Sequence, residues 1–257
     1  MLNIQPIAAF SDNYIWLISD PASRQAFVVD PGDAGPVLET LQAQQLNLAG
    51  ILITHHHFDH TGGMAALCAR FQPVVYGPHN PVIAGITHRL GAGDTLEVLG
   101  MSLDVLEVPG HTLDHIAYVH RGESPLVFCG DTLFAGGCGR LFEGNPAMML
   151  RSLERLAALA PSTKVYCAHE YTLSNLAFAR AVEPHNADLL ARSTLAEETR
   201  RRGEPTVPSH IALELATNPF LRCNAMALQE SLRQQGRLQS DSPVDVFTLV
   251  RGWKDGF

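Results

Sequence analysis

Residues 54–63, with the sequence THHHFDHTGG, constrain the fold of this chain more than any other segment. They follow the apolar run at residues 50–54, which is typical of a buried strand, and they end in a Gly-Gly turn. Alternate side chains of an extended segment share one side, so His55 and His57 can bind one metal ion. If the chain then turns into a helix, Asp59 and His60 project from the turn toward a second ion. The segment therefore predicts two metal ions, each of which needs further ligands from elsewhere.

Three other metal-type residues follow short apolar runs further along the chain. His111 follows residues 103–108, Asp131 follows residues 126–129, and His169 follows residues 164–167. Open sheets with helical crossovers place ligand sites at their strand ends, so these positions fit a shared site. Taken singly, each is more typical of a loop histidine or a turn aspartate. Together with the first cluster they make seven candidate ligands, and sharing Asp131 would give each ion four.

At this point a family resemblance becomes specific. The segments THHHFDHTGG, PGHT, CGDTLF and CAHEYT, in this order, resemble the metallo-β-lactamase superfamily. Within it, GGCGRLFEG, AHEYTLSNLAFA, NPFLR and the closing RGWKDGF are similar to the hydroxyacylglutathione hydrolase family, also called glyoxalase II. The resemblance extends from FSDNY near the start to the last residues. The superfamily motif alone is shared by several kinds of enzyme, and the additional motifs narrow the choice.

The resemblance implies how the candidate ligands divide. One ion is held by His55, His57 and His111, the other by Asp59, His60 and His169, and Asp131 bridges the two. Asp59 and Asp131 are also assigned as the catalytic residues. Zinc is the metal that we expect, with iron or manganese as alternatives, since all three accept mixed histidine and aspartate ligands.

The resemblance also implies the reaction. Water held by two cations has a lowered pKa, which suits the hydrolysis of esters, amides, thioesters and phosphoesters. The family similarity narrows this to a thioesterase that converts S-(2-hydroxyacyl)glutathione, S-lactoylglutathione foremost, to a 2-hydroxy acid (D-lactate) and glutathione, the second step of methylglyoxal detoxification. A metal-dependent lactonase is the alternative. A persulfide-type oxygenase with one iron and a non-catalytic metal or redox module agree less well with the complete ligand set.

Substrate binding needs local positive charge, because glutathione is anionic and the chain has a net charge of −8. Arg251 and Lys254 can share one face of a last helical turn. From spacing alone, basic residues that complement the helix dipole are the better interpretation. The resemblance instead assigns this pair to the glycine carboxylate of glutathione, and Arg140 and Tyr171 to its backbone. Two positions depart from the family pattern: Arg140 stands where many members have lysine, and Phe142 replaces an aromatic hydroxyl.

The composition sets limits on class and location. An apolar fraction of 46% in 257 residues supports a sizeable core, and no apolar run is long enough to span a membrane. The N-terminus lacks a basic region followed by an apolar stretch, so we expect no secretory signal. Five cysteines without a C-x-x-C pair indicate reduced thiols in a cytoplasmic protein. The acidic net charge argues against nucleic-acid binding, and we expect a monomer that acts on a small-molecule thioester.

The pattern of apolar residues divides the chain into two regions. Residues 1–169 mix strand-like runs with helical patterns, which predicts an α/β fold, an αββα sandwich in which helices cover two packed sheets. The expected strands are 13–19, 25–30, 49–54, 74–76, 95–98, 102–108, 116–120, 125–129 and 164–167, and the expected helices are 35–45, 63–71 and 146–158. Residues 170–257 have no convincing strand and predict a smaller all-helical domain, with helices at 173–181, 186–202, 209–216, 224–233 and 241–251. We therefore expect a metal-binding catalytic domain at 1–169 and a helical substrate-binding domain at 170–257.

Two residues near the expected site keep open roles. Asp30, at a predicted strand end in VVDPGD, belongs to a Pro-Gly turn or supports a ligand histidine. His115 lies close to His111 in sequence and is either such a support or an ordinary residue at the start of a strand.

Overall fold

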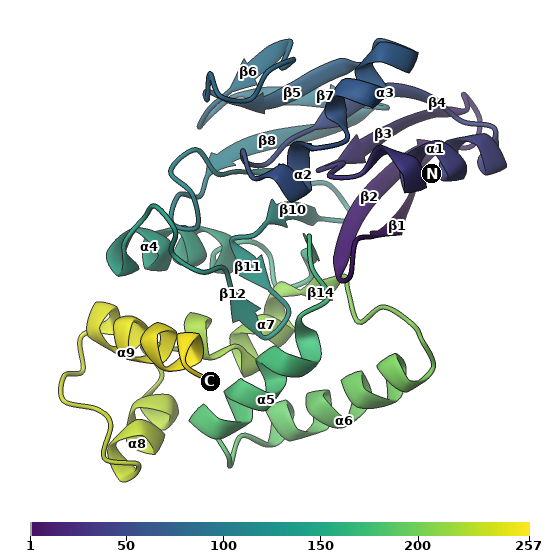
Figure 1. Ribbon diagram of the computed structural model, residues 1–257. Coiled ribbons are helices and arrows are strands. Elements are labelled where there is room, and N and C mark those ends of the chain that lie inside the picture. Colours follow the sequence, from purple (N-terminus) through teal and green to yellow (C-terminus); the bar gives the residue numbers. More distant parts are fainter. Residues whose placement is uncertain (1) are drawn as a thin grey trace. The chain divides into compact units, whose positions relative to one another are not determined.

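In a computed structural model, the described residues 2–257 form two compact units (Figure 1). The first contains the chain up to Glu107 together with Asp114–Gly130, and the second contains Val108–Leu113 and Asp131–Phe257. This division by packing falls at other residues than the domain boundary expected after residue 169, which stays a prediction.

A six-stranded mixed sheet dominates the first unit. Its strands are, in order, β1 (Asn3–Ala9), β2 (Asn13–Asp20), β3 (Gln25–Val29), β4 (Asn47–Leu52), β5 (Val74–Pro78) and β6 (His88–Leu90). The first three pair antiparallel, and β3 to β6 pair parallel. Parallel neighbours need crossover connections, which α1 (Ala34–Gln44) supplies before β4, and α2 (Phe58–Thr61) and α3 (Met64–Phe71) supply before β5.

Helices α1 and α3 cover one face of this sheet. Val37 and Leu41 of α1 and Leu67 of α3 lie in one buried cluster with strand residues such as Val28 and Ile51. Side chains alternate between the two faces of a strand, so every second strand residue reaches this cluster. Full burial of each such side chain contributes about 1.5–3 kcal/mol. This packing fixes the ends of β3 and β4, where the first candidate ligands follow.

The first unit also contains four antiparallel strands of a second sheet. They are β7 (Thr95–Val98), β8 (Met101–Glu107), β9 (Ile116–His120) and β10 (Leu126–Gly130), in the order β10-β9-β8-β7. Tyr118 of β9 is fully buried, and its hydroxyl donates to the carbonyl of Ile53, just beyond β4, at 2.7 Å. Burial raises the pKa of Tyr118 well above its ordinary value, so the hydroxyl keeps its proton. This hydrogen bond connects the two sheets beside the THHHFDH segment.

The second unit is mainly helical. Its short strands are β11 (Leu133–Phe134) and β12 (Gly137–Cys138), which form a hairpin, and β13 (Lys164–Cys167) and β14 (Ser209–His210), which pair antiparallel. Its helices are α4 (Pro146–Ala157), α5 (Thr172–Val182), α6 (Ala187–Arg201), α7 (Ile211–Thr217), a 3-10 turn at Pro219–Leu221, α8 (Met226–Gln234) and α9 (Pro243–Asp255). Among residues 2–257 the structure contains no helix with the length and apolar character that a membrane span needs.

The sequence patterns predicted most of these elements and missed strand β1 and several short ones. Strands β1, β6, β11 and β12 and helix α2 were not expected. The expectation of no strand after residue 170 was wrong, because Ser209 and His210 pair with Val165 and Lys164. The helix expected from residue 209 begins instead at Ile211, since the side chain of His210 accepts from the Leu213 N–H at 2.9 Å and caps the helix.

Replacing Tyr118 by Phe should lower the free energy of unfolding by about 1–3 kcal/mol, because the buried carbonyl of Ile53 loses its donor. Thermal melting of the metal-free protein would show this as a fall in Tm of about 2–4 °C per kcal/mol. The matched control is Tyr76→Phe, which removes the same atom from a tyrosine that is only partly buried. Equal changes in Tm for the two variants would contradict the role given to the Tyr118 hydroxyl.

Candidate metal centre

The THHHFDH segment begins two residues after β4 and runs into the short helix α2, which starts at Phe58. His55 and His60 are fully buried there, whereas the side chain of Asp59 is 39% exposed. The turn that follows β3 packs tightly against this helix: a Cβ added to Gly32 would lie 1.8 Å from the backbone oxygen of Asp59. The Pro-Gly turn in VVDPGD is therefore required for the backbone of α2 to approach so closely.

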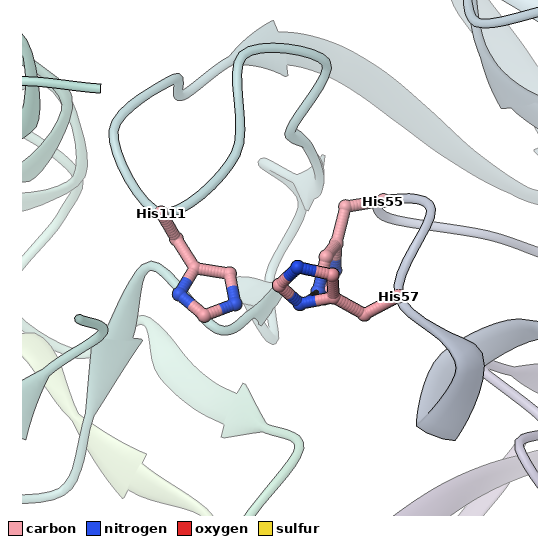
Figure 2. Close-up of side chains that lie close together, drawn as sticks. All are labelled: His55, His57 and His111. Atoms are coloured by element: carbon pink, nitrogen blue, oxygen red, sulfur yellow. Dashed lines mark hydrogen bonds between the residues drawn. The ribbon is translucent and has the colours of Figure 1, made fainter. Parts of the chain in front are cut away.

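His55 and His57 approach each other through ring nitrogens. His55 Nε2 lies 3.1 Å from His57 Nδ1, and the two rings meet edge to face, with centroids 4.8 Å apart (Figure 2). Nδ1 of His55 lies 3.0 Å from the hydroxyl of Thr54, so Nε2 is the nitrogen that His55 presents. His115 is buried and stacks on the His55 ring, with centroids 4.5 Å apart and planes within 16°. His115 also lies directly before β9, so the contact with His55 is made by a residue at the start of a strand, and both roles left open for it stay predictions.

Asp30 determines which nitrogen of His60 carries a lone pair. Its Oδ2 lies 2.9 Å from His60 Nδ1, and both groups are buried. A carboxylate accepts, so Nδ1 carries the proton and Nε2 carries the lone pair. The same carboxylate also accepts from the backbone N–H and the hydroxyl of Thr54, each at 2.7 Å. Asp30 thus orients His60, and its own backbone adopts a φ of 53°, which aspartate tolerates better than most residues.

Asp59 is held by a residue that the sequence patterns did not single out. Asn13 Nδ2 donates to Asp59 Oδ2 at 3.0 Å, and the same oxygen lies 3.5 Å from His60 Nε2. The motif FSDNY near the start of the chain supplies this asparagine. The Asn13 amide donates to Oδ2 of Asp59 and not to Oδ1.

In the second unit, Asp131 lies at the same distance from two histidines. Its Oδ2 is 3.4 Å from His111 Nε2 and 3.4 Å from His169 Nε2, and all three side chains are buried. His111 Nδ1 donates to the carbonyl of Arg140 at 2.9 Å, so the lone pair of His111 is on Nε2. One carboxylate oxygen therefore faces two imidazole nitrogens, as a bridging ligand would.

The seven candidate ligands gather into clusters. Within the first unit His55 lies beside His57 (Figure 2) and Asp59 lies beside His60, and within the second unit the Asp131 carboxylate lies beside both His111 and His169. Two ligands that bind one tetrahedral ion at about 2.0–2.1 Å lie about 3.3 Å apart. The ligand-atom separations given above, from 3.1 to 3.5 Å, fit this value. The donor set of imidazole nitrogens and carboxylate oxygens suits divalent ions such as zinc, iron and manganese.

The loop between Asp131 and Arg140 is held by a buried polar network. Glu214 is fully buried and accepts from the backbone N–H of Gly136 at 2.8 Å and from the side chains of Arg192 and Asn218. Asn218 also donates to the carbonyl of Gly137 at 2.9 Å. Burial raises the pKa of Glu214, but the Arg192 charge and these hydrogen bonds outweigh it and hold the pKa below its ordinary value. Sequence reasoning missed this network, because buried ion pairs leave no pattern in spacing.

The four residues assigned to substrate binding differ in their surroundings. The side chain of Arg140 is 66% exposed, whereas Arg251 is 95% buried and donates to the Cys138 carbonyl at 3.0 Å. Lys254 Nζ donates to the backbone carbonyl of Ser174 at 3.2 Å. Tyr171 stacks on His169, with ring centroids 4.6 Å apart and planes within 6°.

Phe142, the second departure from the family pattern, is also placed by the structure. Its side chain is 64% exposed and lies edge-on to the His111 ring, with centroids 5.3 Å apart. It contributes packing beside a candidate ligand and has no polar group to offer.

The fold and the histidine and aspartate clusters define a protein of the metallo-β-lactamase type. Residues 10–169 match the family model described as metallo-beta-lactamase superfamily. Among solved structures, ETHE1 from Myxococcus xanthus has a TM-score of 0.66 at 27% identity and 99% coverage of both chains. TTHA1623 in a di-iron-bound form has a TM-score of 0.61 at 25% identity, over 84% of this chain and 100% of that chain. The fold class expected from the sequence is confirmed.

The last third of the chain narrows the class. Residues 170–257 match the model described as hydroxyacylglutathione hydrolase C-terminus. The hydroxyacylglutathione hydrolase of Pseudomonas aeruginosa strain LESB58 is 53% identical over 258 residues, with 100% of both chains covered. That of Nitrosomonas europaea is 50% identical over 259 residues, with 100% of this chain and 97% of the relative covered. The chain belongs to the hydroxyacylglutathione hydrolase family, as the sequence motifs indicated.

Replacing Asp30 by Asn should lower metal affinity about 10–100-fold. The amide NH2 can donate to His60 Nδ1, which favours the tautomer with the proton on Nε2, the nitrogen that would bind the metal. Metal content after dialysis against a graded series of chelator concentrations measures the change. The control is Asp33→Asn, three residues away, where Asp33 caps α1 by accepting from the Gly35 N–H at 2.9 Å. Metal retention by Asp30→Asn equal to that of the control would show that Asp30 does not orient a ligand.

Proposed function

We propose that this protein is a binuclear metal-dependent thioesterase that hydrolyses S-(2-hydroxyacyl)glutathione, S-lactoylglutathione foremost, to a 2-hydroxy acid and glutathione. The observation that carries the proposal is the Asp131 carboxylate oxygen, 3.4 Å from both His111 and His169, in a chain of the hydroxyacylglutathione hydrolase family. D-Lactate is the product expected from the lactoyl thioester, and the reaction would be the second step in removing methylglyoxal.

We assign the seven clustered side chains as ligands of two divalent ions. In this proposal His55, His57 and His111 bind one ion, Asp59, His60 and His169 bind the other, and Asp131 is shared. Bound ions would supply a water of lowered pKa and would polarise the thioester carbonyl. Zinc is the metal that we propose, and iron is the principal alternative because TTHA1623, a structural relative, was solved in a di-iron-bound form.

Asp59 is the catalytic residue that substrate and water reach. Its side chain is 39% exposed, whereas the ligand histidines of the same segment that precede and follow it, His55 and His60, are buried. Asn13 holds Oδ2 in place, and the Asp59 carboxylate would accept a proton from the attacking water. Asp131, which is buried, keeps the two histidines that flank it in place. The leaving thiol ionises near pH ~8.5, so the thiolate departs without a strong general acid.

We propose that the glutathione moiety binds at the cationic residues Arg140, Arg251 and Lys254. Tyr171, two residues after the candidate ligand His169, is the fourth proposed contact. Burial, followed by the charges of Arg251 and Arg140, lowers the pKa of Lys254. Cations that repel one another in this way favour an anionic ligand, and here they do so in a chain whose net charge is −8. A carboxylate of glutathione is the group that we expect at this position. This gives the helical region from residue 170 its proposed substrate-binding role.

The cysteines support a reducing location, and we propose the cytoplasm. Within residues 2–257 none of the five forms a disulfide, and burial raises the pKa of Cys138 to about 11 and of Cys167 to about 12. Such thiols stay protonated and unreactive, as structural cysteines of reduced compartments do. We further propose that the protein acts as a monomer on a small-molecule thioester.

Purified protein loaded with zinc should hydrolyse S-lactoylglutathione, measured as the loss of thioester absorbance, far faster than a neutral lactone, measured by acid release. The His169→Ala variant should lose most of the thioesterase activity, because it removes one of the proposed ligands. Fast lactone hydrolysis with slow thioester hydrolysis would overturn the proposal in favour of a lactonase. Absence of both activities would remove the catalytic assignment.

Replacing Lys254 by Ala should raise KM for the thioester about tenfold with little change in kcat, since the charge binds a part of the substrate that does not react. The control is Lys164→Ala, an exposed lysine at the start of β13. The pKa of Lys254 lies below 10.5, so its positive charge is lost as the pH is increased toward 10.5. The wild-type KM should therefore increase over that pH range, and the KM of the variant should not. A fall in kcat at constant KM would contradict the assignment.

A further inference from the structure

The cationic residues of the second unit share one carboxylate. Arg251 Nη2 donates to Asp255 Oδ1 at 2.8 Å, and Arg140 Nε lies 3.9 Å from the same oxygen. Lys254 precedes Asp255 in α9. Burial, then the charges of Arg251 and Arg140, lower the pKa of Lys254, and the charge of Asp255 opposes part of this lowering. Two arginines thus approach a single carboxylate, with Lys254 next to it along the helix, and Asp255 is 47% exposed.

The position of Asp255 is unfavourable for its own helix. It is the last residue of α9, where the helix dipole places partial negative charge and where basic residues are preferred. An acidic residue here opposes the dipole, which offsets part of the gain from its i,i+4 ion pair with Arg251. Residues that break a local rule are expected at functional positions.

Arg251 has its orientation fixed without Asp255. Its Nη1 donates to the Cys138 carbonyl at 3.0 Å, and its guanidinium lies over the Phe220 ring at 5.0 Å. The residue is 95% buried, and within residues 2–257 its Nε has no hydrogen-bond partner. Asp255 contacts Arg251 at Nη2, and because the Asp255 carboxylate is half-exposed, an anion from solvent would reach Nη2 by displacing it.

We propose that Asp255 is an affinity-setting residue: it occupies the Nη2 edge of Arg251 in the free enzyme and must be displaced by a carboxylate of the glutathione moiety. The inference rests on the proposed function, because it takes glutathione as the ligand of this cationic cluster. Asp255 stands in for the substrate carboxylate, so it weakens binding of the substrate and of the product glutathione alike. An interaction that the enzyme makes equally with the substrate and with the product does not raise kcat. Weaker binding of glutathione speeds its release after the reaction.

The test is equilibrium binding of glutathione and of S-methylglutathione, a thioether that cannot be hydrolysed, to zinc-loaded wild type and to Asp255→Asn, by isothermal titration calorimetry. The variant should bind both about three- to tenfold more tightly, and KM for S-lactoylglutathione should fall by a similar factor. The matched control is Asp104→Asn, which removes the same charge from another Asp–Arg pair, Asp104 with Arg121 at 2.8 Å. The control should leave both constants unchanged.

A second probe separates competition from a structural effect. Glutathione esterified at its glycine carboxylate lacks the group that would displace Asp255, so Asp255→Asn should change its affinity far less than that of glutathione. Equal or weaker binding of free glutathione by Asp255→Asn would overturn the inference, as would equal tightening for the ester. If wild type hydrolyses the thioester while either result is obtained, only this inference fails. If wild type hydrolyses no glutathione thioester, the proposed function fails.

Discussion

A buried aspartate oxygen that lies 3.4 Å from two histidine nitrogens is the contact on which the proposed chemistry depends. Asp131 faces His111 and His169 at the distances expected of ligands on tetrahedral ions. A second buried carboxylate, Asp30, sets the tautomer of His60 through Nδ1. Both carboxylates are costly to bury alone and become favourable beside histidines and, in our proposal, cations. The remaining features of the site keep these two groups fixed.

The candidate ligands were predictable because their chemistry is local in sequence. Within THHHFDH the spacing alone proposes pairs of ligands, and His111, Asp131 and His169 each follow an apolar run that becomes, or lies beside, a strand. The resemblance to the hydroxyacylglutathione hydrolase family, confirmed by relatives of 50–53% identity, gave the order of these motifs a meaning. The main helices and strands were likewise predictable, since their periodic apolar residues are buried in the cores.

The contacts that support the site were not predictable in the same way. Asn13 reaches Asp59 from 46 residues away, and Asn218 holds Gly137 from 81 residues away, so neither pairing leaves a trace in local spacing. The strand β14 was missed because two residues form no pattern. Burial of Arg251 was also not foreseen: a basic residue near a C-terminus is typical of an exposed helix end, yet this one is held inside by the Cys138 carbonyl.

The number and positions of the bound ions test the central claim most directly. Crystals of the zinc-loaded protein, measured at the zinc absorption edge, give an anomalous difference map in which each ion appears as a peak. The account predicts two peaks per chain about 3.5–4 Å apart, with the Asp131 carboxylate between them. One peak at full loading, or two peaks with Asp131 beside neither or only one, would contradict it.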